Sequence, residues 1–214
     1  MTPATDSAIT PAARSVAALV GLLALFGLAL DLAAGWAGTL IPQLWGMARY
    51  FTILTNGIAA ATLLGAAAAG RPAPPGWLGG VTLWMAITAL VFHLLLGGTY
   101  PLLTLDWGAN LVLHTLAPAA VLAWWLAAAP TRGLGPRHAI LWLGWPALYC
   151  GYALLRGAAD GVYPYFFVDV ARLGWAGFGR WFGILLVAFW VGGLLLAGLG
   201  RAIDRPGGRP LARG

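Results

Sequence analysis

The sequence is organised as long apolar stretches separated by short polar segments. A membrane-spanning helix needs about 20 consecutive, mostly apolar residues, and such stretches follow one another along the whole chain. The pattern therefore predicts an all-α fold, a bundle of six transmembrane helices. The predicted spans are residues 15–36, 50–69, 78–98, 108–129, 138–156 and 178–199.

The two ends of the chain differ in composition from the apolar part. Residues 1–14 are polar and contain Pro and Thr, and residues 201–214 are rich in Arg, Pro and Gly. We expect a flexible N-terminal segment, a transmembrane domain over residues 15–200 and a disordered basic tail. Pro118 and Pro146 fall inside predicted spans and should kink them, and neighbouring helices can satisfy the carbonyls that each proline leaves free.

Composition argues against a soluble domain. Hydrophobic residues make up 61% of the chain and charged residues 8%, whereas soluble domains carry roughly 25% charged residues. The basic residues are all Arg and the acidic ones all Asp, a bias that, with the Ala and Gly content, indicates a GC-rich bacterial genome. We therefore expect a bacterial inner membrane, where arginines contact anionic lipid headgroups and do not imply nucleic-acid binding.

The distribution of arginines predicts the orientation in that membrane. If both termini are cytoplasmic, eight arginines lie on the cytoplasmic side and four outside, in agreement with the usual excess of positive charge inside. The cytoplasmic set is Arg14, Arg71, Arg132, Arg137, Arg201, Arg205, Arg209 and Arg213, and the outer set is Arg49, Arg156, Arg172 and Arg180.

Polar side chains within the predicted spans gather toward the outer ends of the helices. Polar groups inside a bilayer are costly, and they normally face a bundle interior or a water-filled cavity. We therefore expect a polar cavity that opens toward the outer leaflet. Its candidate members are Asp31, Thr52, Thr55, Asn56, His93, Asn110, His114 and Arg156.

Two of these helices carry their polar residues on a single face. Thr52, Thr55 and Asn56 have the spacing i, i+3, i+4, and Asn110 and His114 have the spacing i, i+4, so each set shares a face. Thr52 and His114 lie at similar depths in the membrane on their two predicted spans. If the two faces meet, the imidazole can accept the hydroxyl proton, which would give a nucleophile with an adjacent general base.

Other nucleophiles are scarce along the chain. The serines are Ser7 and Ser15, outside or at the edge of the membrane, and no Gly-x-Ser-x-Gly motif occurs. The single cysteine, Cys150, excludes an intramolecular disulfide and a multi-cysteine metal site, and its apolar surroundings are typical of a small packing residue. Threonine is therefore the candidate alcohol nucleophile.

Other interpretations stay open. Threonine in a membrane helix often bonds its own backbone carbonyl, so Thr52 can be inert in a non-catalytic lipid-binding or scaffold protein. His93 and His114 could be the two axial ligands of a haem. A three-histidine metal site is disfavoured because His138 lies at the inner end of its span. A transporter is disfavoured because no continuous polar path reaches the inner side.

Three short motifs, taken together and in order, resemble one family. They are Tyr50-Phe51-Thr52, His114-Thr115-x-x-Pro118 and Gly161-Val162-Tyr163-Pro164-Tyr165. They resemble the androgen-induced-protein family, which includes androgen-dependent TFPI-regulating protein and a bacterial branch of six-span membrane proteins. The resemblance extends from about residue 49 to the end of the last span, and the placement of the motifs on the spans also matches.

Animal members of that family are threonine hydrolases that cleave fatty acid esters of hydroxy fatty acids. The resemblance implies that Thr52 is the nucleophile, that His114 is the base, and that the substrate is a lipid or fatty acyl ester; we expect no cofactor and no metal. An acyl-threonine would form, and water would then hydrolyse it. Oxyanion donors would be needed, and the candidates are Asn56, Asn110 and Arg49.

The loop at residues 157–177, before the last span, has two interpretations. It is either an interfacial loop with an aromatic belt or a lid over the cavity, with Arg156 or Arg172 binding a fatty acid carboxylate. Asp169 of this loop, or Asp106, could orient a histidine. The side chains that define the loop are Asp160, Tyr163, Tyr165, Asp169, Arg172 and Trp175.

Overall fold

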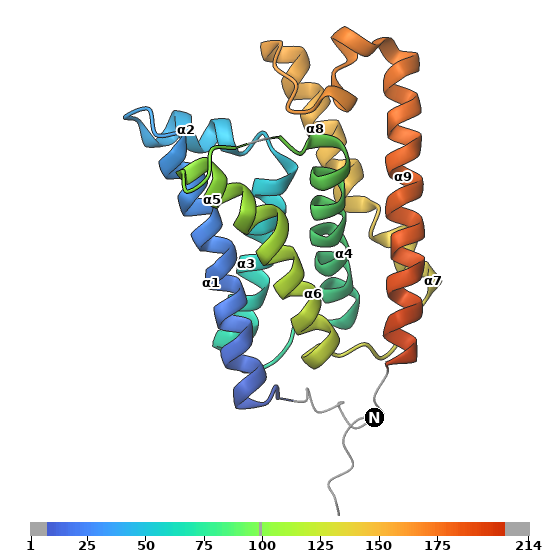
Figure 1. Ribbon diagram of the computed structural model, residues 1–214. Coiled ribbons are helices and arrows are strands. Elements are labelled where there is room, and N and C mark those ends of the chain that lie inside the picture. Colours follow the sequence, from blue (N-terminus) through green and yellow to red (C-terminus); the bar gives the residue numbers. More distant parts are fainter. Residues whose placement is uncertain (1–7, 99, 204–214) are drawn as a thin grey trace, which may run out of the picture.

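The computed structural model describes residues 8–98 and 100–203, and all regular structure within them is helical. Five helices are long and apolar enough to cross a membrane, which confirms five of the predicted spans by length and composition. They stand side by side as a bundle (Figure 1). They are α1 (Pro11–Ala34), α3 (Phe51–Ala69), α4 (Pro75–Val91) with η1 (Phe92–Leu96), α5 (Leu105–Leu111) with η2 (Val112–Leu116) and α6 (Ala117–Ala128), and α9 (Val170–Ala202).

The ends of the chain are only partly described. Residues 1–7 and 204–214, which are half of the predicted N-terminal segment and most of the predicted basic tail, lie outside the described residues. Helix α1 begins at Pro11, earlier than the predicted span, because the Thr10 hydroxyl accepts the Ala13 N–H at 3.2 Å and caps the helix. A proline in the first turn loses no intrahelical hydrogen bond.

The predicted span at residues 138–156 is two helices, α7 (Pro136–Leu141) and α8 (Gly144–Asp160), where the sequence predicted one kinked helix. Pro146 has no N–H to donate to the carbonyl of Trp142, four residues earlier. The Trp84 indole N–H, from α4, donates to that carbonyl instead at 2.9 Å. A neighbouring helix thus satisfies the freed carbonyl, as the sequence predicted, and the backbone breaks there.

Helices α7 and α8 together run from one end of the bundle to the other (Figure 1). Near the start of this pair, the Trp142 indole N–H donates to the Gly76 carbonyl at the beginning of α4, at 2.6 Å. At its end, Arg156 donates to the Trp45 carbonyl on the short helix α2 (Leu40–Met47), which the sequence pattern did not predict. The upper end of the bundle in Figure 1, where α2 lies, is called the α2 end below.

Two of the long helices contain a π-helical segment, and each segment includes a histidine. The segment η1 contains His93 and η2 contains His114; π-turns inside α-helices are frequent at functional sites. Just after η2, Pro118 has no N–H for the ladder of hydrogen bonds. The Asn56 side-chain amide, from α3, donates to the Leu113 carbonyl at 3.3 Å. The polar faces of α3 and η2 therefore meet, which is the condition that the sequence analysis set for a contact between Thr52 and His114.

The segment before α9 folds back onto the bundle through the 3-10 turn η3 (Phe166–Val168). Helix α9 begins at Val170, eight residues before the predicted span, with the Asp169 side chain accepting the Arg172 N–H at 3.1 Å. The chain turns sharply at Gly174, whose φ of 64° lies in the region that favours glycine. The aromatic part of this loop thereby reaches the cavity described below.

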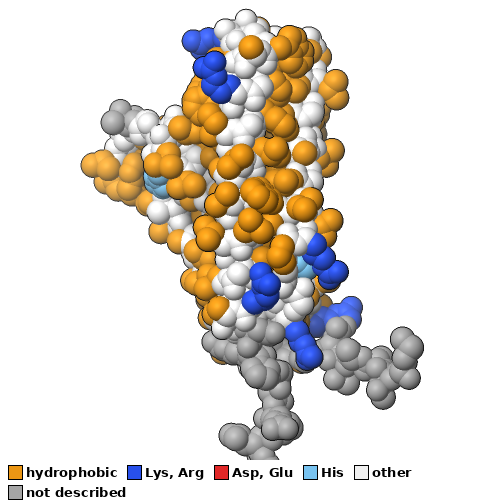
Figure 2. All heavy atoms as spheres, turned by 90° about the vertical axis from the view of Figure 1, so that its right-hand side faces the viewer, with side chains coloured by type: hydrophobic (Ala, Val, Ile, Leu, Met, Phe, Trp, Pro, Cys, Tyr) orange, Lys and Arg blue, Asp and Glu red, His pale blue; other side chains and the backbone are white. Residues whose placement is uncertain are grey.

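The outer surface of the bundle is apolar along its length. Figure 2 shows hydrophobic side chains covering the middle of one face, with arginines near both ends. On α9, the side chains of Ile184, Val187 and Leu195 are exposed. An exposed apolar belt between two charged ends is what a lipid bilayer requires of a spanning protein.

The Trp142 side chain, which directly follows α7, packs against α4 where α4 carries glycine. The buried Trp142 indole lies against Gly79 and Gly80, and a Cβ added at Gly79 would come within 2.5 Å of the ring. Membrane helices use small residues in this way to bring backbones and large side chains together. The contact therefore depends on the missing side chain.

We expect Gly79→Ala to lower the stability of the detergent-solubilised protein by about 1–3 kcal/mol, because the ring or the helix must move. The matched control is Gly183→Ala on α9, where an added Cβ meets no atom within 4 Å. Because alanine has a higher helix propensity than glycine, this change should leave the stability unchanged or raise it. Thermal unfolding followed by tryptophan fluorescence measures both variants. Equal midpoints for the two would contradict the close contact.

Candidate active site

The structure brings Thr52 and His114 together at the α2 end of the bundle. Thr52 lies in the first turn of α3 and His114 lies in η2, and the distance from Thr52 Oγ1 to His114 Nε2 is 3.1 Å. Both side chains are largely removed from the surface, with Thr52 8% exposed. This is the hydrogen-bond distance expected between an alcohol nucleophile and its general base.

The other ring nitrogen of His114 faces a fixed acceptor. His114 Nδ1 lies 3.3 Å from the Asn110 backbone carbonyl, which can only accept a hydrogen bond. With the proton on Nδ1, the lone pair of Nε2 points at the Thr52 hydroxyl. The Phe92 ring stacks on the imidazole with 3.8 Å between centroids and 12° between planes, and this contact holds the ring in place.

Thr52 differs from the other buried threonines of the bundle. Thr82 and Thr88 donate to the carbonyls of Leu78 and Trp84, four residues earlier on α4, each at 2.8 Å, which is the common behaviour of threonine in a membrane helix. Thr52 lies too close to the start of its helix for such a bond, and its hydroxyl is directed at an imidazole. The bond to a backbone carbonyl of the same helix, which the sequence left open for Thr52, is thus found at Thr82 and Thr88, and the Thr52 hydroxyl has a different partner.

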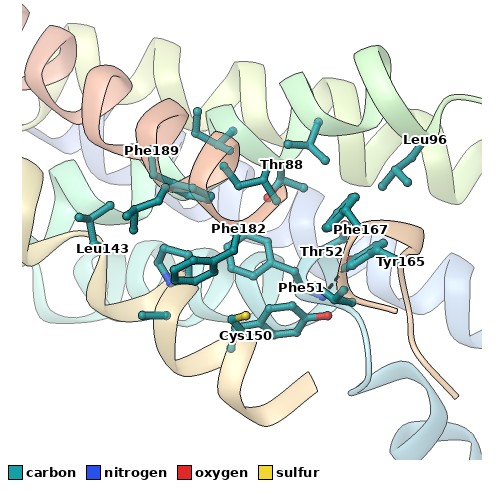
Figure 3. A pocket seen from close by; sticks show the side chains of 18 of the residues that line it. Phe51, Thr52, Thr88, Leu96, Leu143, Cys150, Tyr165, Phe167, Phe182 and Phe189 are labelled. Carbon is teal, nitrogen blue, oxygen red and sulfur yellow. Dashed lines mark hydrogen bonds between the residues drawn. The ribbon is translucent and has the colours of Figure 1, made fainter. Parts of the chain in front are cut away.

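A largely apolar cavity adjoins Thr52. It encloses about 830 Å³ of space that no atom fills, open solvent at its mouth included. Helices α3, α4, α8 and α9 and the segments η1 and η3 form its walls. Figure 3 shows Phe189 and Leu143 toward one end of it and Tyr165, Phe167 and Leu96 toward the other.

Polar groups line the cavity at only a few places. Besides Thr52 and Tyr165 they are Thr88, Tyr149 and Cys150, and Thr88 uses its hydroxyl on α4 itself. The Tyr149 hydroxyl donates to the Arg49 carbonyl at 2.8 Å. The cavity therefore suits a long apolar group, with polar chemistry concentrated where Thr52 and Tyr165 meet.

Tyr165 is the member of the predicted loop that reaches the nucleophile. Its hydroxyl oxygen accepts the Phe51 backbone N–H at 3.0 Å, and Thr52 and the Tyr149 hydroxyl lie beside that oxygen. Burial raises the pKa of the Tyr165 phenol. The sequence placed Tyr165 in a lid without assigning it a partner, because Phe51 is 114 residues away along the chain.

Asn56 and Thr55 stabilise the site from one turn deeper on α3. The Asn56 amide nitrogen donates to the Thr52 carbonyl at 2.9 Å as well as to Leu113, and the Thr55 hydroxyl accepts the Trp145 indole N–H at 3.0 Å. Both side chains are fully buried. Asn56 thus ties α3 to η2 next to the Thr52–His114 contact.

The other two candidate oxyanion donors are also engaged by the protein. The Arg49 guanidinium forms a bidentate ion pair with Asp160, with nitrogen–oxygen distances of 2.5 and 3.0 Å, and also donates to the Val162 carbonyl. The Asn110 side-chain amide donates to the Asp106 backbone carbonyl at 2.8 Å. Each of the three donors that the sequence suggested is thus engaged by a backbone carbonyl or a carboxylate, Asn56 by the carbonyl of Thr52 itself.

The arginine candidates for carboxylate binding lie apart from Thr52. Arg156 is buried, donates to the Tyr152 hydroxyl and the Trp45 carbonyl at 2.6 Å each, and stacks over the Trp45 ring at 4.0 Å. Arg172 is exposed in the first turn of α9. Tyr163 packs against Gly157, where no Cβ would fit. Together these contacts anchor the loop to α8 and α2.

Neither Asp169 nor Asp106 supplies the hydrogen-bond acceptor that orients His114 in this structure. Asp169 caps α9, and Asp106 lies in the exposed first turn of α5. Asp31, near the end of α1, lines a separate polar hollow with Arg49 and Asp106. The acceptor on His114 Nδ1 is a backbone carbonyl instead of a carboxylate.

His93 and His114 both contact Phe92, and each faces a threonine hydroxyl. His93 Nε2 lies 3.0 Å from the Thr115 hydroxyl, and Phe92 contacts both the His93 and the His114 rings. A haem held by both histidines would have to break both threonine contacts. Among the described residues, no three His, Cys, Asp or Glu side chains are grouped as a metal site requires.

The Arg49–Asp160 pair should make stability depend on pH. The hydrogen bond from Arg49, together with that from the Val162 N–H, lowers the pKa of Asp160 from 3.8 to about 2. A carboxyl whose folded pKa is depressed stabilises the fold above its unfolded pKa and loses that contribution as pH falls through the folded value. Asp160→Asn should therefore unfold at a lower temperature than wild type at pH 7, and the difference should shrink between pH 4 and pH 2.

Unfolding in detergent at several pH values measures this difference, and an Arg49→Gln background gives the control. When the guanidinium is absent, Asp160→Asn should have little further effect, because the double-mutant cycle removes the same interaction. A difference between Asp160→Asn and wild type that stays constant from pH 7 to pH 2 would contradict the ion pair.

Comparison with known protein families, with curated proteins and with solved structures found no match to this chain.

Proposed function

We propose that this protein is a membrane-embedded threonine hydrolase that cleaves a lipid ester, with Thr52 as nucleophile and His114 as general base. The observation that carries the proposal is the 3.1 Å contact between Thr52 Oγ1 and His114 Nε2 at the wall of an apolar cavity. The resemblance of the three sequence motifs to the androgen-induced-protein family supports a fatty acid ester of a hydroxy fatty acid as the substrate type.

The proposed reaction has two halves that use the same pair. The Thr52 hydroxyl proton passes to His114 Nε2 while Oγ1 bonds to the ester carbonyl carbon and the C=O electron pair moves onto the oxygen. When that pair returns, the bond to the alcohol breaks, and the alcohol oxygen takes the proton from His114. Water then adds to the acyl-threonine, giving its proton to His114, and the carboxylic acid leaves as Thr52 regains a proton.

The bundle supports a lipid substrate and a six-span arrangement. Helices α7 and α8 cross between the two ends in two pieces, so we propose that they form the sixth span. Both ends of the described chain then lie on one side, which the arginine distribution favours as the cytoplasm. The Thr52 end of the cavity lies at the α2 end, toward the outer leaflet, and the apolar walls suit an acyl chain that comes from the bilayer.

A non-catalytic lipid-binding protein is the second candidate. The engagement of Arg49, Asn56 and Asn110 by other partners favours it, because ester hydrolysis needs donors for the oxyanion. Such a protein would hold lipid in the same cavity, and Thr52 would be inert. The two candidates therefore differ in turnover and in covalent labelling, and they agree on lipid binding.

We expect Thr52→Ala to abolish labelling by a fluorophosphonate probe and to lower ester turnover by at least about 10²-fold, because the attacking oxygen is lost. His114→Ala should have a similar effect on turnover, since general-base catalysis contributes roughly 10²–10⁴-fold. Purified protein in detergent with a long-chain ester substrate provides both measurements.

The matched control is Thr82→Ala, which removes another buried hydroxyl of α4 from a position that does not line the cavity. It should label and turn over like wild type. Labelling of Thr52→Ala equal to that of wild type would sink the assignment of the nucleophile. Wild-type protein that retains lipid but neither labels nor hydrolyses ester would establish the binding protein instead.

A further inference from the structure

The first turn of α3 is capped by a residue from a distant loop. The first N–H groups of a helix have no partner within it, and the Tyr50 side chain at the N-cap position forms no capping hydrogen bond. The Tyr165 hydroxyl, brought in by the segment before η3, accepts the Phe51 N–H. A phenol oxygen is thereby held at the positive end of the α3 dipole, beside the Thr52 hydroxyl.

The hydrogen bonds at this oxygen determine what Tyr165 can offer. Its oxygen accepts the Phe51 N–H, which uses a lone pair and leaves the phenol proton to be donated; the Thr52 and Tyr149 hydroxyls lie beside it. Burial raises the pKa of the phenol, and the group keeps its proton at neutral pH. Accepting N–H bonds at a helix terminus also polarises the O–H bond and makes it a better donor.

The ring of Tyr165 is fixed by its neighbours. It stacks on Phe167 with 5.0 Å between centroids, and its edge meets Tyr50 at 6.0 Å. The same loop is held to α8 by the contact of Tyr163 with Gly157 and by the Arg49–Asp160 pair. The hydroxyl is thus positioned before any substrate binds, which is the condition for an effective oxyanion donor.

We propose that Tyr165 is a further catalytic residue, whose hydroxyl donates a hydrogen bond to the oxyanion that forms when Thr52 attacks the ester. This inference rests on the proposed hydrolase function. The carbonyl oxygen is one bond from the carbon that Oγ1 attacks, so a donor beside Oγ1 reaches it by rotation of its O–H bond. Tyr165 stays protonated throughout; it hydrogen-bonds to the oxygen that gains the electron pair, and releases it when the C=O bond re-forms.

The proposal also explains how the site works although Arg49, Asn56 and Asn110 are engaged elsewhere. Tyr165 lines the cavity next to Thr52, whereas Asn56 bonds two backbone carbonyls and Arg49 pairs with Asp160. Of the two tyrosines that line the cavity, Tyr149 donates its proton to the Arg49 carbonyl, whereas Tyr165 accepts the Phe51 N–H and lies beside Thr52.

The test compares Tyr165→Phe with Tyr163→Phe in the full-length protein in detergent, using a long-chain ester and a fluorophosphonate probe. Loss of one oxyanion donor should lower kcat of Tyr165→Phe by about 10²–10³-fold, slow its labelling, and leave KM within about threefold. Tyr163→Phe, whose ring also packs in the loop, should keep the wild-type kcat. A purely structural cap would instead raise KM or lower the unfolding temperature without this selective loss of kcat.

A second variant covers the case in which Tyr165→Phe does not fold. Replacing Tyr165 with 3-fluorotyrosine keeps the ring and the hydroxyl but makes the hydroxyl a stronger donor, so kcat should rise while KM is unchanged. An unchanged kcat in the folded variants of an active wild type overturns the role of Tyr165 and leaves the Thr52–His114 proposal intact. A wild type that neither labels nor turns over ester removes the hydrolase proposal, and this inference with it.

Discussion

The structure depends on one constraint, that backbone carbonyls buried in an apolar bundle need donors. Two prolines inside helical segments remove donors, and two side chains from neighbouring helices replace them. The Trp84 indole serves the carbonyl freed by Pro146, and the Asn56 amide serves the Leu113 carbonyl before Pro118. The second replacement draws α3 against η2. Thr52 lies one helical turn before Asn56, and His114 directly follows Leu113, so the same hydrogen bond brings the two reactive side chains to the same place.

A buried threonine–histidine pair is not what stability alone would select. Polar groups taken out of water are costly unless they are hydrogen-bonded, and even a satisfied pair contributes little compared with apolar packing. Thr82 and Thr88 show the ordinary arrangement, in which the hydroxyl returns to its own helix. Thr52 instead points at a base whose second nitrogen is held by the Asn110 carbonyl and whose face is covered by Phe92. This arrangement favours chemistry over packing as the reason for the pair.

The sequence predicted the features that depend on local periodicity. Apolar stretches predicted the five long helices, and the spacing of Thr52 with Asn56 and of Asn110 with His114 indicated that each pair shares a face of its helix. It did not predict the break between α7 and α8, the helix α2, or the two π-helical segments, because these depend on partners far away in the chain. Residue type identified Arg49 and Asn56 as hydrogen-bond donors. It could not show that Arg49 was already paired with Asp160, 111 residues later.

The loop before α9 illustrates how segments far apart in the sequence build the end of the cavity at which Thr52 lies. Its sequence motif was visible, yet its role follows only from where the fold places it. Arg49 directly precedes the first turn of α3, and its ion pair with Asp160 fixes the start of the loop. Tyr165 then returns to that same turn and caps it through Phe51. Because Tyr165 caps the helix that carries Thr52, movement of the loop away from α3 would uncap the helix and remove the phenol from Thr52 in one step. The capping of α3 and the polar end of the cavity therefore depend on the same contact.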